Sequence, residues 1–224
     1  MFEAGAGDGR FLALLASRGF AADGVEPEPG LWRRAVGRGA RVRCLPLEQA
    51  SLADGSRDAV VAWHVLEHLE RPRDALELFR PALRRDGFIV VAVPNLGSLQ
   101  ARLAGNDWFH QDVPRHRTHF TVPGLRALLS RSGFETRRVA HVLVEQNALG
   151  MWQSILNRLT VEPNVAFRAL KRDLGGLERR ARRRDLAITL AAGAPLAPLA
   201  VGLELAAGLA RMGGTVVVTA RPAA

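Results

Sequence analysis

The sequence has no tyrosine, a single cysteine and a single lysine among its 224 residues. One cysteine, Cys44, excludes a disulfide framework and a cysteine-based zinc finger, and it favours the reducing cytoplasm as the compartment. The opening stretch MFEAGAGDGRF has no basic segment followed by an apolar one, so no secretory signal is predicted. A hydrophobic content of 48% without any short repeat excludes collagen-like, coiled-coil and disordered chains. This length suits one globular domain with a sizeable insertion.

Negative charge is in the minority, because 22 Asp and Glu residues stand against 31 Lys and Arg residues and give a formal net charge of +9. Without tyrosine the chain lacks a common stacking platform for bases, which argues against a nucleic-acid partner. Much of the charge comes from residues 168–184, where eight cations stand against Asp173 and Glu178. The cations are Arg168, Lys171, Arg172, Arg179, Arg180, Arg182, Arg183 and Arg184. Such a run is either a solvated helix face or a surface for an anionic partner.

The first 144 residues alternate apolar, strand-like runs with amphipathic, helical stretches. Runs such as DAVVAW and FIVVAV are apolar on both faces, as the strands of a parallel sheet covered by helices must be. Helices are predicted over Arg10–Arg18, Gly30–Gly37, Arg73–Arg84 and Thr121–Gly133. Strands are predicted over Ala22–Glu26, Arg41–Leu45, Asp58–Trp63, Phe88–Val93, Thr136–Val144 and Thr215–Ala220.

This alternation predicts an α/β fold with a doubly wound, Rossmann-like sheet that is mostly parallel. Residues 1–144 are predicted to form the core of the protein. Residues 145–213 are predicted to form a helical insertion, first basic and then apolar. Residues 214–224 then supply a final, antiparallel strand that returns to the core sheet.

The segment from Glu3 to Gly9, EAGAGDG, places glycines at alternate positions directly before a predicted helix. Such glycines allow a sharp turn from strand to helix and let a ligand approach main chain that has no Cβ. Glu26 stands at the end of the next predicted strand, where an acid accepts hydrogen bonds from ribose hydroxyls in βαβ nucleotide sites. The spacing is G-x-G-x-G rather than the G-x-G-x-x-G of dinucleotide-binding proteins, and the sequence contains no P-loop motif.

The pattern E-x-G-x-G-x-G that begins at Glu3 resembles the first motif of the class I S-adenosylmethionine-dependent methyltransferases. Four later segments resemble a bacterial small-molecule subfamily similar to the ubiquinone-biosynthesis type. They are HVLEHL, VPN, DVPRHRTHFT and EQNALGMWQSILNRL, in this order along the chain. The family's first strand normally has several apolar residues before the acid. Only Met1 and Phe2 precede Glu3 here, so we expect either that the chain as given starts late, which is the favoured alternative, or that its central strand is short and its cofactor affinity reduced.

The resemblance implies a site for S-adenosylmethionine at the carboxyl ends of the strands. The methionine part of the cofactor would be wrapped by the first motif, through Glu3, Gly5, Ala6, Gly7 and Gly9. Glu26, with Pro27 beside it, would hold the ribose. Contacts to the adenine and the sulfonium would come from Leu47, Glu48, His64 and Val65. The implied reaction is methyl transfer to a small-molecule or lipid- or sugar-linked acceptor, with oxygen as the expected acceptor atom.

A catalytic base is needed only when the methyl acceptor is a hydroxyl or an ammonium group, since the transfer itself depends mainly on in-line geometry. His116 and His119 stand in a loop predicted to lie over the strand ends, which makes them the first candidates for that base. His64 is the third candidate. Arg115, in the same loop, is a candidate to hold an acidic acceptor.

Three alternatives remain open at this point. Residues 64–68, HVLEH, match the H-x-x-E-H pattern of zinc hydrolases, with both imidazoles expected on one helical face. Within a methyltransferase, Glu67 and His68 could instead bind a divalent metal together with His116 or His119. An NAD-type or non-catalytic nucleotide-binding module is the third alternative, because Glu26 would also suit the ribose of NAD.

The stretch Leu186–Leu203 contains no charged residue and directly follows the arginine-rich run. Its 18 residues reach the lower limit for a membrane span. Pro195, Pro198 and Glu204 favour one or two buried or interfacial helices instead. Residues 168–210 are therefore predicted to make peripheral membrane contact, with the arginines facing water or anionic headgroups. The predicted location is the cytoplasm with membrane association, and the sequence carries no signal that fixes the oligomeric state.

Overall fold

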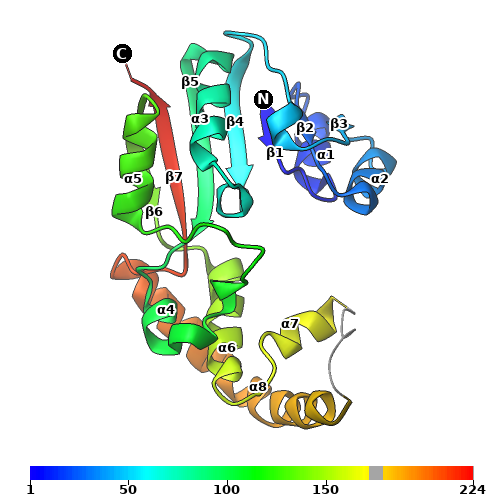
Figure 1. The fold of residues 1–224 in the computed structure, drawn as a ribbon, viewed down its shortest axis with the longest axis vertical. Coiled ribbons are helices and arrows are strands. Elements are labelled where there is room, and N and C mark those ends of the chain that lie inside the picture. Colours follow the sequence, from blue (N-terminus) through cyan, green and yellow to red (C-terminus); the bar gives the residue numbers. More distant parts are fainter. Residues whose placement is uncertain (172–178, 224) are drawn as a thin grey trace. The chain divides into compact units, whose positions relative to one another are not determined.

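The computed structural model describes residues 1–171 and 179–223, and Figure 1 shows their helices and strands along the chain. Arg172, Asp173 and Glu178 of the basic run lie outside the described residues. The chain forms two compact units. The first comprises Met1–Val93, Pro123–Val139 and Val217–Ala224, and the second comprises Pro94–Val122 and Ala140–Val216.

A seven-stranded sheet is the main feature of the first unit. Its strands are β1 Phe2–Ala4, β2 Asp23–Val25, β3 Val42–Arg43, β4 Arg57–Trp63, β5 Leu83–Pro94, β6 Phe134–Ala140 and β7 Thr215–Pro222. They lie in the order β3-β2-β1-β4-β5-β7-β6, and β1 to β5 run parallel to one another. The edge formed by β5, β7 and β6 is antiparallel. This confirms the predicted doubly wound α/β class with an antiparallel last strand.

Strand β1 is only three residues long, yet it stands at the centre of the parallel part of the sheet. It pairs with β2 on one side and with β4 on the other, so that Phe2 is in register with both Asp23 and Val60. Phe2 is fully buried, and its ring packs against Phe79 with the ring centroids 6.4 Å apart. Because the strands are parallel, the segments that follow β1, β2 and β4 meet at one edge of the sheet.

Four helices accompany this sheet: α1 Arg10–Ser17, α2 Pro29–Gly37, α3 Pro72–Ala82 and α5 Val122–Arg131. All four were predicted. Prolines open α2 and α3, where the missing N–H costs no hydrogen bond and the fixed φ suits a helix. The Glu28 carboxylate caps α2 by accepting hydrogen bonds from the N–H groups of Gly30 and Leu31, at 2.7 and 2.6 Å.

Strand β5 is longer than the sequence predicted, and the helix before it is shorter. The predicted helix continued for two more residues, whereas α3 ends at Ala82 and β5 begins at Leu83. Leu83 pairs with Arg57 of β4, and after an irregularity the ladder resumes with Ala59 opposite Phe88. Pairing with a distant strand therefore sets this boundary, which no local signal indicated.

The second unit is helical and contains α4 Leu99–Ala104, α6 Val144–Asn157, α7 Val165–Leu170 and α8 Arg179–Leu209. Residues 94–122 belong to it, whereas the sequence pattern predicted that they are part of the core and that the insertion begins at residue 145. Buried hydrogen bonds explain why residues 94–122 pack with the second unit. Gln100 of α4 donates hydrogen bonds to the Asn147 carbonyl of α6, at 2.7 Å, and to the Glu204 carboxylate of α8, at 2.8 Å. These bonds tie the segment before residue 122 to the helices that follow residue 140.

Helix α8 is one continuous helix of 31 residues, with Pro195 and Pro198 inside it. Arg179–Arg184 of the basic run and the predicted apolar stretch are therefore successive parts of a single helix. Near its carboxyl end Glu204 is 4% exposed, and its carboxylate also accepts a hydrogen bond from the Gly214 N–H at 2.7 Å. Burial raises the pKa of Glu204.

Candidate functional site

The segment after β1 turns sharply into α1. Gly5, Gly7 and Gly9 have φ values of 65°, 56° and 75°, in the left-handed region that other residues rarely adopt. A Cβ added at Gly5 would lie 2.7 Å from Val65 Cγ2, and one at Gly9 would lie 2.6 Å from Ala35 Cβ. A Cβ added at Gly7 would meet no atom within 4 Å. Gly5 and Gly9 are therefore required by packing, whereas the main chain at Gly7 borders open space.

Glu26, directly after β2, ties this loop to the neighbouring strand. Its side chain is 6% exposed, and its two oxygens accept hydrogen bonds from the N–H groups of Gly7, at 2.8 Å, and Glu28, at 2.9 Å. Each carboxylate oxygen can accept a second hydrogen bond. Glu26 can therefore bind the glycine loop and also accept hydrogen bonds from the hydroxyl groups of a ligand. Pro27, between the two acids, is exposed and offers no N–H.

Glu3, in the middle of β1, carries a second buried carboxyl group in the same region. It is 6% exposed, and its Oε2 has no hydrogen-bond partner among the described residues. Burial, assisted by the negative charge of Glu26, raises the pKa of Glu3 to about 8. A positively charged ligand beside Glu3 would offset these two effects and favour its ionised form.

His64 directly follows β4 and has a left-handed backbone with a φ of 53°. Such a conformation is strained for a residue other than glycine and is frequent at functional sites. Its Nδ1 lies 2.8 Å from Oε1 of Glu67. Glu67 is only 1% exposed, and its Oε2 has no hydrogen-bond partner in the part of the chain that the structure describes. A buried carboxylate at Nδ1 orients the ring and favours the tautomer that carries the proton on Nδ1.

The other predicted cofactor residues of the first unit lie near these groups in the chain but differ in exposure. Val65 is 8% exposed and stands beside Gly5. Ala6 is also buried, and its methyl group packs in a core cluster with Leu12, so its side chain supports the fold. After β3, a short 3-10 helix holds Leu47, which is buried, and Glu48, which is exposed.

The zinc-hydrolase alternative required His64 and His68 to share one face of an α-helix. His64 instead follows β4 in a left-handed conformation, and His68 ends a 3-10 helix over Leu66–His68. Residues four apart share a face only where the backbone is α-helical. The predicted helical face is therefore wrong, and the alternatives to a methyltransferase are not favoured.

His116 and His119 belong to the second unit and not to the group around the glycine-rich loop. Their rings lie 2.8 and 3.0 Å from backbone carbonyl oxygens of the preceding 3-10 helix, Phe109–Gln111. His116 is 8% exposed. The predicted metal set of Glu67 and His68 with one of these histidines joins residues of both units, and it stays a prediction.

The pairing of His64 with Glu67 was not predicted from the sequence. An H-x-x-E spacing brings two side chains together on an α-helix, but this segment is not α-helical. The contact occurs at a left-handed residue, and no local pattern indicates that conformation at a histidine. The hydrogen bond from the Gly7 N–H to Glu26 was also not predicted, because the sequence indicates only a ligand-binding role for this acid.

The sequence matches a family model described as "Methyltransferase domain" over residues 2–139. The chain belongs to this family and is an S-adenosylmethionine-dependent methyltransferase. This confirms the class that the glycine-rich motif and Glu26 indicated. The resemblance to the ubiquinone-biosynthesis type stays a prediction. No curated protein matches the chain.

Solved structures share the fold at low sequence identity. A SAM-dependent methyltransferase, possible histamine N-methyltransferase, from Thermotoga maritima is 18% identical with a TM-score of 0.59, over 98% of this chain and 80% of its own. A SAM-dependent methyltransferase from Archaeoglobus fulgidus is 20% identical with a TM-score of 0.60, over 98% and 84%. The 1,6-didemethyltoxoflavin-N1-methyltransferase of Burkholderia thailandensis, with bound 1,6-didemethyltoxoflavin and S-adenosylhomocysteine, is 18% identical with a TM-score of 0.53, over 100% and 70%.

The different surroundings of Gly7 and Gly9 predict different effects of the same substitution. Gly7→Ala adds a methyl group that points into open space, so we expect a loss of stability of only about 1–2 kcal/mol from the left-handed backbone. The methyl group obstructs a ligand there, and we expect the affinity for S-adenosylhomocysteine to fall at least tenfold. Gly9→Ala adds the clash with Ala35 and should destabilise the fold by more than Gly7→Ala. Urea unfolding measures the stability of the two variants, and calorimetric titration measures their affinity for S-adenosylhomocysteine. Equal losses of stability in Gly7→Ala and Gly9→Ala would contradict the different packing assigned to the two glycines.

The buried Glu3 carboxyl predicts a decrease in stability as the pH rises. Its pKa is 4.5 in an unfolded chain and about 8 in the folded protein, so the folded state binds more protons between these values. Over this window the free energy of unfolding should fall by up to about 1.4 kcal/mol per pH unit, and the full stability is present below pH 4.5. Glu3→Gln removes the titrating group and should flatten this slope. The measurement is urea unfolding of the wild-type chain and of Glu3→Gln between pH 5 and 8. If the free energy of unfolding has the same pH dependence in both, Glu3 is not the cause of the decrease.

Proposed function

We propose that this methyltransferase transfers a methyl group to the oxygen of a small-molecule or lipid- or sugar-linked acceptor. The proposal rests on the functional groups that lie at the carboxyl ends of β1, β2 and β4. An open glycine turn, a buried carboxylate and a histidine–carboxylate pair follow these three strands in turn. Ligands of open α/β sheets bind at this edge.

The residues at this edge fit S-adenosylmethionine. Glu26 would accept hydrogen bonds from the ribose hydroxyls while it holds Gly7, and the open main chain at Gly7 would leave room for the methionine part. The carboxyls of Glu3 and Glu26 favour the positive charges that this molecule carries. Val65, Leu47 and Glu48 would border the adenine, as the family resemblance implies. When bound, S-adenosylmethionine supplies an electrophilic methyl group on a sulfonium ion.

His64 is the base in this proposal. A hydroxyl acceptor loses its proton as its oxygen gains the methyl group, and an imidazole accepts a proton readily near neutral pH. With the proton of the neutral ring on Nδ1, facing Glu67, the acceptor nitrogen of His64 is Nε2. The buried Glu67 carboxylate then stabilises the imidazolium that forms. His116 and His119 stay predictions for this role, because they belong to the second unit.

Two observations support this choice of acceptor. The Burkholderia neighbour is named for, and holds, a small molecule beside S-adenosylhomocysteine. The name of that neighbour describes methylation at nitrogen, whereas the histidine–carboxylate pair of this chain suits a hydroxyl, an acceptor whose methylation needs a base.

Calorimetric titration with S-adenosylhomocysteine tests the cofactor site. We expect micromolar binding to the wild-type chain and a loss of at least tenfold in Glu26→Ala, because this variant loses both the ribose acceptor and the bond to Gly7. Glu28→Ala is the matched control: it removes an acid two residues away that caps α2, and it should leave the affinity unchanged. Tighter binding of NAD than of S-adenosylhomocysteine, or equal losses in both variants, would contradict the proposed site.

Nitrogen-15 NMR of the histidine rings tests the pair of His64 and Glu67 without knowledge of the acceptor. At a pH where the ring is neutral, we expect His64 to carry its proton on Nδ1 in the wild-type chain. In Glu67→Ala the ring should shift toward the Nε2–H tautomer, which predominates in water, while the signals of His141 stay unchanged. An Nε2–H ring in the wild-type chain would remove His64 from the proposed role.

A further inference from the structure

The solvent-exposed surface of helix α8 is apolar, whereas surface helices of soluble proteins normally carry polar and charged residues there. Among the described residues it is the one helix long and apolar enough to cross a membrane, and only 11% of its most apolar window is buried in the protein. From Leu186 to Ala210 the sole charged residue is Glu204, and that residue is buried. A surface helix ordinarily places polar residues opposite its buried face. On α8 the most exposed large residues are instead Leu190, Leu199 and Leu209, of which Leu190 is 80% exposed, while Val201 and Leu205 are partly exposed beside a small cavity next to Glu204.

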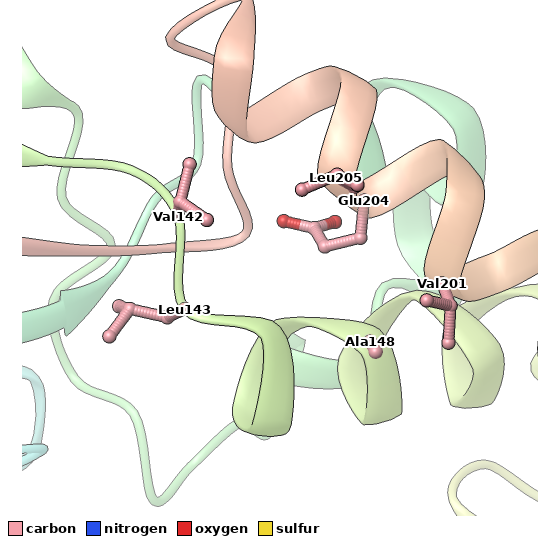
Figure 2. Close-up of a pocket in the computed structure, with 6 residues that line it drawn as sticks. All are labelled: Val142, Leu143, Ala148, Val201, Glu204 and Leu205. Carbon is pink, nitrogen blue, oxygen red and sulfur yellow. The ribbon is translucent and has the colours of Figure 1, made fainter.

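The opposite side of α8 is fixed to its own unit by polar contacts. Gly193 accepts a hydrogen bond from the Trp152 indole of α6 at 2.7 Å. Near the amino end, the buried Asp185 carboxylate accepts a hydrogen bond from the Glu162 N–H at 2.8 Å. Near the carboxyl end, Figure 2 shows Glu204 pointing from α8 into a small cavity that Val142 also lines. These contacts of Asp185, Gly193 and Glu204 keep α8 packed on the second unit. Its exposed apolar residues therefore remain available to bind another molecule.

The amino-terminal turns of the same helix carry positive charge. Arg180, Arg183 and Arg184 are exposed, and Arg182 is partly exposed. The acid next to them, Asp185, is fully buried and bonded to backbone N–H groups, so it does not neutralise the surface. One continuous helix thus presents a cationic end followed by more than six turns of apolar surface.

We propose that α8 docks the protein on the surface of a membrane that contains anionic phospholipids. The arginines match the phosphate headgroups in charge, and the exposed leucines insert at the boundary between headgroups and acyl chains. The helix lies on the bilayer and does not cross it, because crossing would pull Asp185 and Glu204 away from their buried partners. This inference is independent of the reaction proposed above.

Sedimentation of the full chain with vesicles tests the proposal. We expect binding to vesicles of phosphatidylcholine with about one third phosphatidylglycerol, weakened by salt, and little binding to phosphatidylcholine alone. Arg183→Gln with Arg184→Gln should weaken the partition coefficient by roughly 30-fold, from the contribution of about 1 kcal/mol for each cation. Arg126→Gln with Arg131→Gln, two exposed arginines of α5, is the matched control and should bind like the wild type.

The apolar contribution is tested in the same way. Leu190→Glu with Leu199→Glu changes two exposed side chains, so the fold should persist, as circular dichroism would show, while vesicle binding falls at least tenfold. Leu14→Glu with Leu103→Glu, which changes two leucines of α1 and α4 that are 47% and 49% exposed, serves as the control. The proposal is overturned if the chain stays in the supernatant with anionic vesicles at low salt. It is also overturned if α8 resists extraction by alkaline carbonate, as a spanning helix does, or if Leu190→Glu with Leu199→Glu only abolishes self-association.

Discussion

The hydrogen bond from the Gly7 N–H to the Glu26 carboxylate is the contact on which the site of this methyltransferase depends. It joins the turn after β1 to the residue after β2, and the second oxygen of the same carboxylate holds the backbone of Glu28. The glycine turn is thereby fixed against the start of α2. The carboxylate is buried and made rigid by these two bonds, which is the preorganisation that a ligand-binding acid needs.

The remaining groups of the site follow from this frame. Glu3 shares the buried region with Glu26, and burial together with the negative charge of Glu26 disfavours the charged form of Glu3, an effect that a cation beside them would offset. Val65 packs against Gly5, which brings the end of β4 to the same edge of the sheet, with His64 directly before it. His64 has a strained backbone, and the buried Glu67 lies at its ring. Binding of the cofactor does not by itself require this pair. For this reason the proposed reaction assigns the proton transfer to this pair.

The sequence predicted the parts of this structure that local patterns determine. The runs DAVVAW and FIVVAV identified buried parallel strands, and the glycines with Glu26 identified the cofactor class. Contacts between distant segments escaped the prediction: Leu83 opposite Arg57, which lengthens β5, and Gln100 bonded to Glu204, which joins residues 94–122 to the second unit. The left-handed backbone of His64 also escaped the prediction, because no local pattern indicates that conformation at a histidine.

Hydrogen–deuterium exchange of the purified chain, with and without S-adenosylhomocysteine, tests the central claim most directly. It reports on the N–H groups of the glycine turn themselves and needs neither a variant nor a known methyl acceptor. The account predicts that protection on binding is greatest in three segments, Glu3–Gly9, Glu26–Gly30 and His64–His68. An absence of protection in these segments, or protection confined to the second unit, would contradict it.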